Sequence, residues 1–130
     1  MPRLFTLAEA ASLLPQLTGL LAAMQAKKRE LDEAQEALSR LLTKAAGNGY
    51  LLERQLADHR TTVERRLEEL NALIEQVNAL GCDVKDVDMG LVDFPIVREG
   101  RAVYLCWRLV EPAIAHWHEL EVGYAGRQPL

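Results

Sequence analysis

The sequence contains few cysteines and no long apolar run. Its two cysteines, Cys82 and Cys106, are too few and too far apart for a disulfide framework or a C-x-x-C metal site, so both are expected to be free thiols. No segment approaches the ~20 consecutive apolar residues that a membrane span requires. Because the N-terminal residues also lack the apolar stretch of a signal peptide, the sequence predicts a cytoplasmic protein without membrane contact.

A surplus of positive charge is missing as well. The 130 residues include 15 Lys and Arg against 19 Asp and Glu, which gives a formal net charge of −4 and a sequence pI near 5.4. Proteins that hold nucleic acid by neutralising its phosphates need a surplus of Lys and Arg on one face. The sequence therefore predicts no nucleic-acid partner.

No complete catalytic motif occurs in the sequence, so the residues alone leave open whether the protein is an enzyme. The composition that is present, 49% hydrophobic and 26% charged, is ordinary for a globular protein and argues against disorder. A chain of 130 residues is the size of one domain. We therefore assign residues 1–130 to a single domain.

The start of the chain has clear helix signals. Thr6 followed by Glu9 is a capping box, which predicts a short lead helix over residues 7–13. Proline lacks a backbone N–H and fits best in the first turn of a helix. Pro15 therefore predicts either that the lead helix ends before it or that the helix kinks there, with a long helix that begins close to Pro15.

Two segments of residues 1–80 repeat apolar side chains every seven positions, which is typical of a coiled-coil seam. They are separated by Gly47-Asn48-Gly49, whose residues end a helix easily, and the second ends near Gly81. The sequence thus predicts a long antiparallel helical hairpin. Its seam residues are Leu17, Met24, Leu31 and Leu38, followed by Leu56, Val63, Leu70 and Val77.

The first long helix is apolar over more than one stripe near its start. Leu13, Leu14 and Leu21 add a second stripe beside Leu17 and Met24. One partner helix cannot cover that width. The extra surface must contact the C-terminal segment or another subunit, and together with the heptads it predicts a homodimer.

After Gly81 the apolar spacing changes from the helical period towards alternation, so residues 81–130 are predicted to form an antiparallel β-meander and a C-terminal tail. Gly100 falls at a hairpin turn that favours positive φ, and His116 and His118 share one face of the last strand. The predicted fold class is therefore α+β. The three predicted strands cover residues 91–97, 102–108 and 114–121.

Several stretches of the sequence together resemble an uncharacterised prokaryotic family catalogued as domain of unknown function 2203. The resemblance covers essentially the whole chain and implies no particular activity. It is carried by Phe5-Thr6-Leu7, Leu13-Leu14-Pro15, Gly90-Leu91-Val92-Asp93-Phe94-Pro95, Val103-Tyr104-Leu105-Cys106-Trp107-Arg108, Trp117-His118-Glu119 and Gly126-Arg127-Gln128-Pro129.

The strongest metal candidate in the sequence is His116-Trp117-His118-Glu119. Two imidazoles that project from one strand face can reach the same ion, and Glu119 can add an oxygen ligand if the strand ends or bulges there. Glu111 and Glu121 are alternative oxygen ligands. A divalent, zinc-like metal is the cofactor that this pattern predicts, while a pair of histidines that simply caps the sheet is the alternative.

Two further sets of residues are candidates for chemistry. Cys106 and His118 form a thiol–imidazole pair if the strand register aligns them; otherwise Cys106 is a small buried hydrophobe. Asp93, Arg108 and Arg127 would frame a pocket for an anionic or polar ligand, because arginine binds carboxylate or phosphate in a bidentate manner. An ordinary cross-strand Asp–Arg pair explains the first two equally well.

Two functional hypotheses follow. In the first, the protein is a non-catalytic assembly or adaptor module whose hairpin self-associates or recruits a protein partner. In the second, it is a ligand-binding or metal-dependent protein with a site on the β-meander. That site comprises Asp93, Cys106, Arg108 and Arg127 for a ligand and His116, His118 and Glu119 for a metal.

Overall fold

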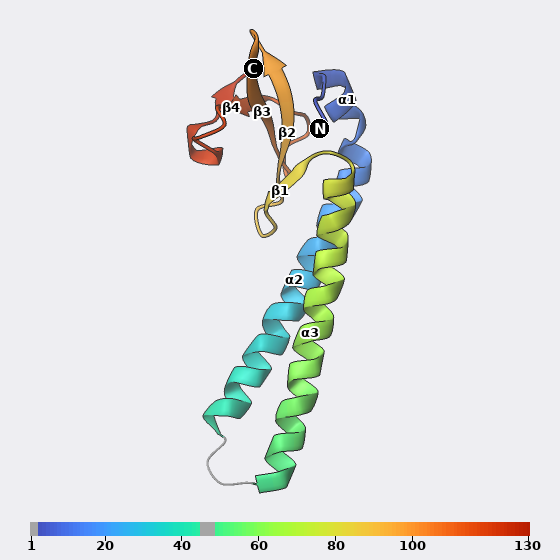
Figure 1. Cartoon of the computed structure of the whole chain (residues 1–130), viewed down its shortest axis with the longest axis vertical. Coiled ribbons are helices and arrows are strands. Elements are labelled where there is room, and N and C mark those ends of the chain that lie inside the picture. Colours follow the sequence, from blue (N-terminus) through green and yellow to red (C-terminus); the bar gives the residue numbers. More distant parts are fainter. Residues whose placement is uncertain (1–2, 45–48) are drawn as a thin grey trace.

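The fold is α+β, as the sequence predicts, with three helices followed by a five-stranded antiparallel sheet in the order β1-β2-β3-β4-β5 (Figure 1). A computed structural model of the chain describes residues 3–44 and 49–130. The helices are α1 (Leu7–Ser12), α2 (Leu14–Thr43) and α3 (Gly49–Ala79), with a 3-10 turn at Tyr124–Gly126. The strands are β1 (Asp83–Asp86), β2 (Leu91–Arg98), β3 (Arg101–Arg108), β4 (His116–His118) and β5 (Gln128–Pro129).

The first helix begins as the sequence predicts. The Thr6 hydroxyl accepts a hydrogen bond from the Glu9 backbone N–H at 3.1 Å, and the Glu9 carboxylate accepts one from the Thr6 N–H at 3.0 Å. This capping box satisfies two N–H groups that have no partner within the helix. Pro15 then occupies the first turn of α2, where its missing N–H breaks no intrahelical hydrogen bond.

Helices α2 and α3 lie side by side and extend away from the sheet as a long hairpin (Figure 1). Of the predicted turn Gly47-Asn48-Gly49, the first two residues lie outside the described residues, and α3 begins at Gly49. No helix in the ranges 3–44 and 49–130 is long and apolar enough to cross a membrane. Buried seam residues concentrate at the end nearest the sheet: Leu17, Met24, Leu31, Leu70 and Val77.

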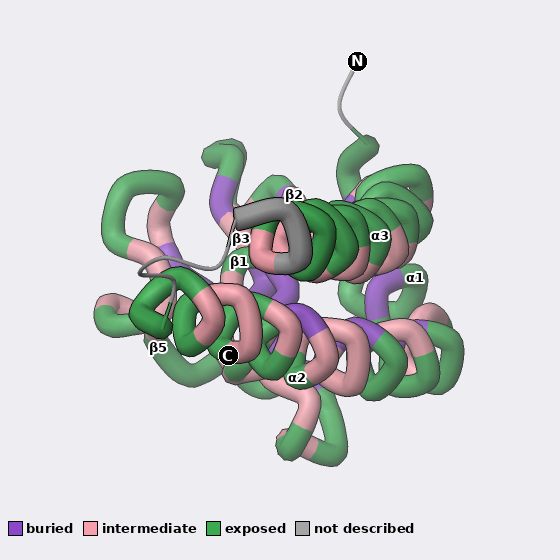
Figure 2. The backbone as a smooth tube through the Cα atoms, turned by 90° about the horizontal axis from the view of Figure 1, so that it is seen from below, coloured by how far each residue is buried: buried purple, intermediate pink, exposed green. Residues whose placement is uncertain are grey.

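The sheet covers the second apolar stripe of α2. Leu21 is fully buried, and it belongs to the same hydrophobic core as Phe94 and Leu105 of the sheet. The Gln25 amide joins the turn after β1 to α2, since it donates hydrogen bonds of 3.1 Å to the carbonyl oxygens at positions 87 and 88. Figure 2, seen from below, shows buried segments between the elements and exposed outer helix faces. Leu21 is therefore covered within the chain, whereas Leu13 and Leu14 are half-buried against the same core.

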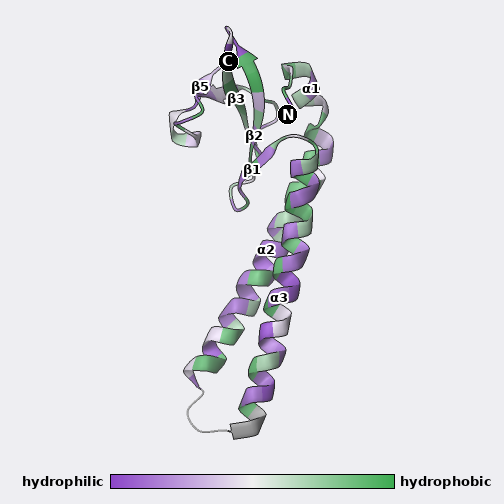
Figure 3. Cartoon of the chain, in the orientation of Figure 1, coloured by the Kyte–Doolittle hydropathy of each residue, from purple (hydrophilic) through white to green (hydrophobic). Residues whose placement is uncertain are grey.

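The hairpin becomes more polar towards its far end. Lys27 of α2 and Glu69 of α3 form an ion pair with an N–O distance of 2.6 Å, and Arg66 lies 3.9 Å from the Glu30 carboxylate. Figure 3 shows hydrophilic residues along much of both long helices, in contrast to β2 and β3. The seam residues beyond Leu31 are only half-buried: Leu38, Leu41, Leu56 and Val63.

The sheet has two strands that the sequence pattern did not predict, and its fourth strand is shorter than expected. Asp83–Asp86 pairs with β2 although only one of its four residues is apolar, and β5 contains a proline in just two residues. The predicted strand 114–121 is reduced to His116–His118, because the chain enters a turn at Glu119. Backbone pairing to neighbouring strands, rather than alternation, defines these elements.

The turn between β2 and β3 explains why this hairpin is tight. Glu99 and Gly100 both have positive φ, 51° and 77°, and they join the paired residues Arg98 and Arg101. Two central residues with positive φ match the twist of the flanking strands, as in a type I′ turn. The predicted need for positive φ at Gly100 is confirmed.

Replacing Gly90 with alanine is expected to lower the free energy of unfolding by roughly 2–4 kcal/mol. Gly90 has φ of 66°, and an added Cβ would lie 2.6 Å from the Leu109 Cβ, so backbone strain and a steric clash combine. Urea denaturation followed by circular dichroism measures the change. The control is Gly19→Ala, which has open space inside α2 and should stabilise the protein by about 0.5–1 kcal/mol. Equal effects of the two substitutions would contradict the prediction.

Candidate metal centre

One face of the sheet is polar, and strand register determines which residues occupy it. Asp93 lies opposite Cys106, which lies opposite His116. Two residues further along the same strands, Tyr104 lies opposite His118. Residues directly opposite one another in antiparallel strands point to the same side of the sheet. All of these side chains therefore share one face, while the intervening row Phe94, Leu105 and Trp117 enters the hydrophobic core.

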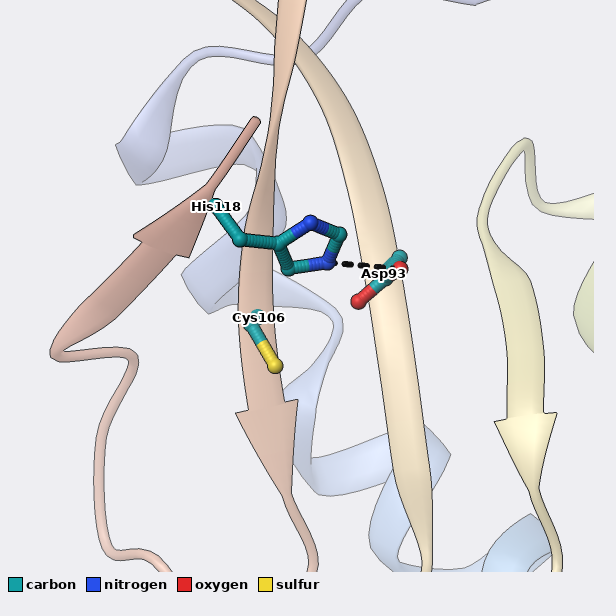
Figure 4. Close-up of side chains that lie close together, drawn as sticks. All are labelled: Asp93, Cys106 and His118. Atoms are coloured by element: carbon teal, nitrogen blue, oxygen red, sulfur yellow. Dashed lines mark hydrogen bonds and ion pairs between the residues drawn. The ribbon is translucent and has the colours of Figure 1, made fainter. Parts of the chain in front are cut away.

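Asp93, Cys106 and His118 meet on this polar face, each from a different strand, and we call them the Asp–Cys–His cluster (Figure 4). One ligand atom of each side chain lies within 4.8 Å of the other two. The His118 Nε2 lies 2.9 Å from the Asp93 Oδ2. Only 2% of Asp93, 2% of His118 and none of Cys106 is exposed, so the cluster is almost completely removed from solvent.

The hydrogen bonds of His118 assign its protons. The Nδ1 atom lies 2.7 Å from the backbone carbonyl oxygen of Glu119, and because a carbonyl oxygen only accepts, Nδ1 carries a hydrogen. The contact between Nε2 and the Asp93 carboxyl then needs one further proton, on either the ring or the carboxyl. Asp93 and His118 therefore share a single proton in the interior.

Burial raises the pKa of Asp93, and the hydrogen bond with His118 and the charge of Lys85 oppose that rise. Its second carboxyl oxygen, Oδ1, is buried and has no hydrogen-bond partner among the described residues. A buried polar atom without a partner is destabilising in an otherwise satisfied site. The Asp93 carboxyl therefore has one oxygen without a well-aligned hydrogen bond, although the neighbouring Cys106 thiol also helps to lower its pKa.

The environment of Cys106 keeps the thiol protonated. Burial and the nearby Asp93 carboxylate raise the pKa of Cys106 to about 11, although Arg127 opposes the rise. The strand register, which the sequence left open, places Cys106 and His118 on one face, yet both ring nitrogens of His118 bond elsewhere. A nucleophilic cysteine needs a base directed at its thiol. The geometry therefore does not support a thiol–imidazole nucleophile.

The metal set predicted from the sequence, His116, His118 and Glu119, does not converge. The Glu119 carboxylate points away from the cluster and forms an ion pair with Arg101 at 2.8 Å. His116 lies on the polar face, with its Nδ1 3.4 Å from the Glu111 carboxylate but without a well-aligned hydrogen bond. Of the three, only His118 belongs to the cluster, where Asp93 and Cys106 take the positions expected for the others.

The residues predicted to frame a ligand pocket, Asp93, Arg108 and Arg127, do not contact a common space but bind different partners. Asp93 contacts His118, and no ion pair joins it to Arg108 within the described ranges. The Arg127 guanidinium donates to the Glu111 carboxylate at 3.0 Å, and the Arg108 backbone N–H donates to the same oxygen at 2.8 Å. Burial raises the pKa of Glu111, but the two hydrogen bonds lower it further, so the pKa lies below its usual value. Arg127 is therefore committed to a carboxylate of the protein itself.

A pocket of about 330 Å³ opens in front of the Asp–Cys–His cluster. Asp93 and His118 line it, and the segment from Leu120 to Tyr124 forms part of its wall. A larger hollow of about 570 Å³ lies between the end of α3 and β3 and shares Tyr104 and Leu120 with it, but touches no cluster residue. The smaller pocket is the one that gives access to the cluster.

The spacing of the cluster is compatible with a small metal ion. Zinc bonds of about 2.0–2.3 Å to nitrogen, oxygen and sulfur place tetrahedral ligands about 3.3–3.8 Å apart. The separations here range from 2.9 Å between His118 and Asp93 to at most 4.8 Å. The longest separation that the cluster allows would have to close by about 1 Å to reach these metal distances.

The comparisons with known proteins identify a family without a described activity. The sequence pattern of the family described as "Uncharacterized conserved protein (DUF2203)" matches residues 3–130. No curated protein and no solved structure gives a match.

Proposed function

The chain belongs to the DUF2203 family of uncharacterized conserved proteins, and we propose that it binds a zinc-like divalent metal through Asp93, Cys106 and His118. The observation that carries this proposal is the convergence of three ligand types from three strands at the base of a pocket, with a buried oxygen of Asp93 unpartnered. Buried polar atoms are ordinarily hydrogen bonded to protein or to water, so an unpaired carboxylate oxygen beside two other ligand atoms is compatible with an added ion.

The ligand chemistry supports zinc more than calcium or magnesium. Thiolate and imidazole are soft or borderline ligands that zinc prefers, whereas the two alkaline-earth ions take oxygen ligands almost exclusively. The hydrogen bond from the His118 Nδ1 to the Glu119 carbonyl fixes the ring so that Nε2 faces the other two ligands. This outer contact is the usual support of a metal-binding histidine.

The decisive experiment uses protein purified without an affinity tag and stripped with a chelator. Calorimetric titration with zinc chloride, followed by elemental analysis of the dialysed protein, should give one ion per chain. Cobalt substitution adds a second readout, because a thiolate ligand produces a charge-transfer absorption band. Protein that takes up no zinc, or that binds it without the thiolate band in the cobalt form, would rule the proposal out.

A second candidate function concerns the helical hairpin. Its seam is fully buried near the sheet but only half-buried beyond Leu31, and the apolar side chains of Leu42 and Leu67 are 50% and 44% exposed. Two helices alone leave such a seam open to solvent, whereas a second hairpin or a partner helix would close it. These observations favour an assembly or adaptor role in which the hairpin forms a homodimer or recruits a protein partner.

Sedimentation velocity at micromolar concentration is expected to show a dimer that Leu67→Glu converts to monomer. The substitution places a charge where the second hairpin would bury an apolar side chain, so self-association should weaken at least tenfold. Val110→Glu is the matched control, because Val110 is 77% exposed in the turn after β3, outside the helical hairpin. A wild-type protein that sediments only as monomer would count against self-association.

A further inference from the structure

The pocket in front of the Asp–Cys–His cluster combines one free cation with apolar walls. Lys85 lines it and forms no ion pair with any described residue; its ammonium lies 5.5 Å from the centre of the Tyr104 ring. That ring packs against His118, with 5.4 Å between ring centres. The apolar part of the wall comprises Leu91, Leu120 and Val122. A ligand that fits these walls has an anionic head and an apolar body.

The cluster would present an open coordination position to this pocket. Asp93 and His118 line the pocket, whereas Cys106 is fully buried behind them. Three protein ligands leave a tetrahedral zinc with one position for an exogenous group. That group must arrive from the pocket side, where Lys85 also lies.

Glu121 restricts the charge of the ligand. Glu121 is an acidic residue of the same pocket lining, and Asp93 lies at the base. In the zinc-loaded site the two charges of the ion offset the Asp93 carboxylate and the Cys106 thiolate, and Glu121 offsets Lys85, so no surplus positive charge remains to hold a dianion such as sulfate or phosphate. The charges therefore favour a head group with a single negative charge.

We infer that the pocket binds a small apolar carboxylic acid in its ionised form, with its carboxylate on the metal beside Lys85 and its body against Leu91, Leu120 and Val122. This inference rests on the proposed metal site and names the class of ligand that the site accepts. The carboxylate satisfies the open metal position and the ammonium together, and the body displaces water from apolar walls.

The test is a calorimetric titration of the zinc-loaded full-length protein with benzoate, with sulfate as the dianionic comparison. Benzoate should bind in a saturable manner and at least tenfold more tightly than sulfate. Lys85→Met should weaken benzoate binding about tenfold while the protein still takes up one zinc ion per chain, because the ammonium contacts the anion and is not a metal ligand. Lys44→Met, at the end of α2 and away from the pocket, should leave both affinities unchanged.

The outcomes distinguish a failure of the ligand assignment from a failure of the proposed metal site. Zinc uptake without benzoate binding overturns the ligand assignment and leaves the metal site intact. Benzoate affinity that is equal in the metal-free protein, or equal in the Lys85→Met variant, also overturns it. A failure to bind zinc is a failure of the metal site itself, and the titration of the stripped protein detects that independently.

Discussion

Replacing Cys106 with serine is expected to weaken zinc binding at least about a hundredfold. Loss of a supporting group outside the ligand shell already weakens metal affinity by about 10–100-fold, and loss of a direct ligand has the larger effect. A serine hydroxyl at the Cys106 position remains protonated and is a poor zinc ligand, whereas a metal-bound thiol is deprotonated outright. Calorimetry against a competing chelator measures the change.

Two matched controls show whether the effect belongs to the Asp–Cys–His cluster. Cys82→Ser removes the other buried cysteine, whose thiol contacts the Val77 carbonyl at 3.6 Å, and should retain zinc affinity. Glu119→Gln changes a residue of the metal set predicted from the sequence and should also retain it. If Glu119→Gln or His116→Ala abolished binding while Cys106→Ser did not, the site would be the one predicted from the sequence.

Replacing His118 with leucine is expected to lower the free energy of unfolding of the metal-free protein by roughly 3–5 kcal/mol at neutral pH. The substitution leaves the Asp93 carboxylate, which is 2% exposed, without its partner in the protein interior. An isolated buried charge is far less stable than a paired one. Urea denaturation of chelator-treated protein provides the measurement.

A second substitution and the pH dependence identify the cause of that loss. Asp93→Asn in the His118→Leu background removes the charge and should recover at least half of the lost free energy. Burial raises the pKa of Asp93, and its stabilising partner is absent from the variant. When the pKa of a carboxyl is higher in the folded than in the unfolded state, the free energy of unfolding falls as pH rises through the folded pKa. The deficit should therefore shrink as the pH is lowered, and a deficit that is constant with pH would point to lost packing instead.

Parts of the fold follow directly from local sequence signals. The Thr6–Glu9 capping box and Pro15 predict the two helix starts within a residue or so of α1 and α2. Such signals act over three or four residues, so no distant contact can move them far. The polar strand β1 and the two-residue β5 carry no comparable local pattern, and only their neighbours in the sheet define them.

The candidate site was only partly predictable. Asp93 interrupts an otherwise apolar strand, Leu91-Val92-Asp93-Phe94, and this pattern predicts a buried carboxylate. Alternation also placed His116 and His118 on one face. Spacing along the strand could not show that His118 turns to Asp93 while Glu119 turns to Arg101, because those partners lie on other strands.

The sequence by itself determined which segments are helical, where the extended part begins and which residues alternate between two faces. These properties depend on periods of 3.6 and 2 residues and on capping groups close by in the chain. Only the tertiary structure decided that Asp93, Cys106 and His118 share one buried position and that the sheet covers the second stripe of α2. Strand register sets such contacts, and here it joins side chains 25 positions apart.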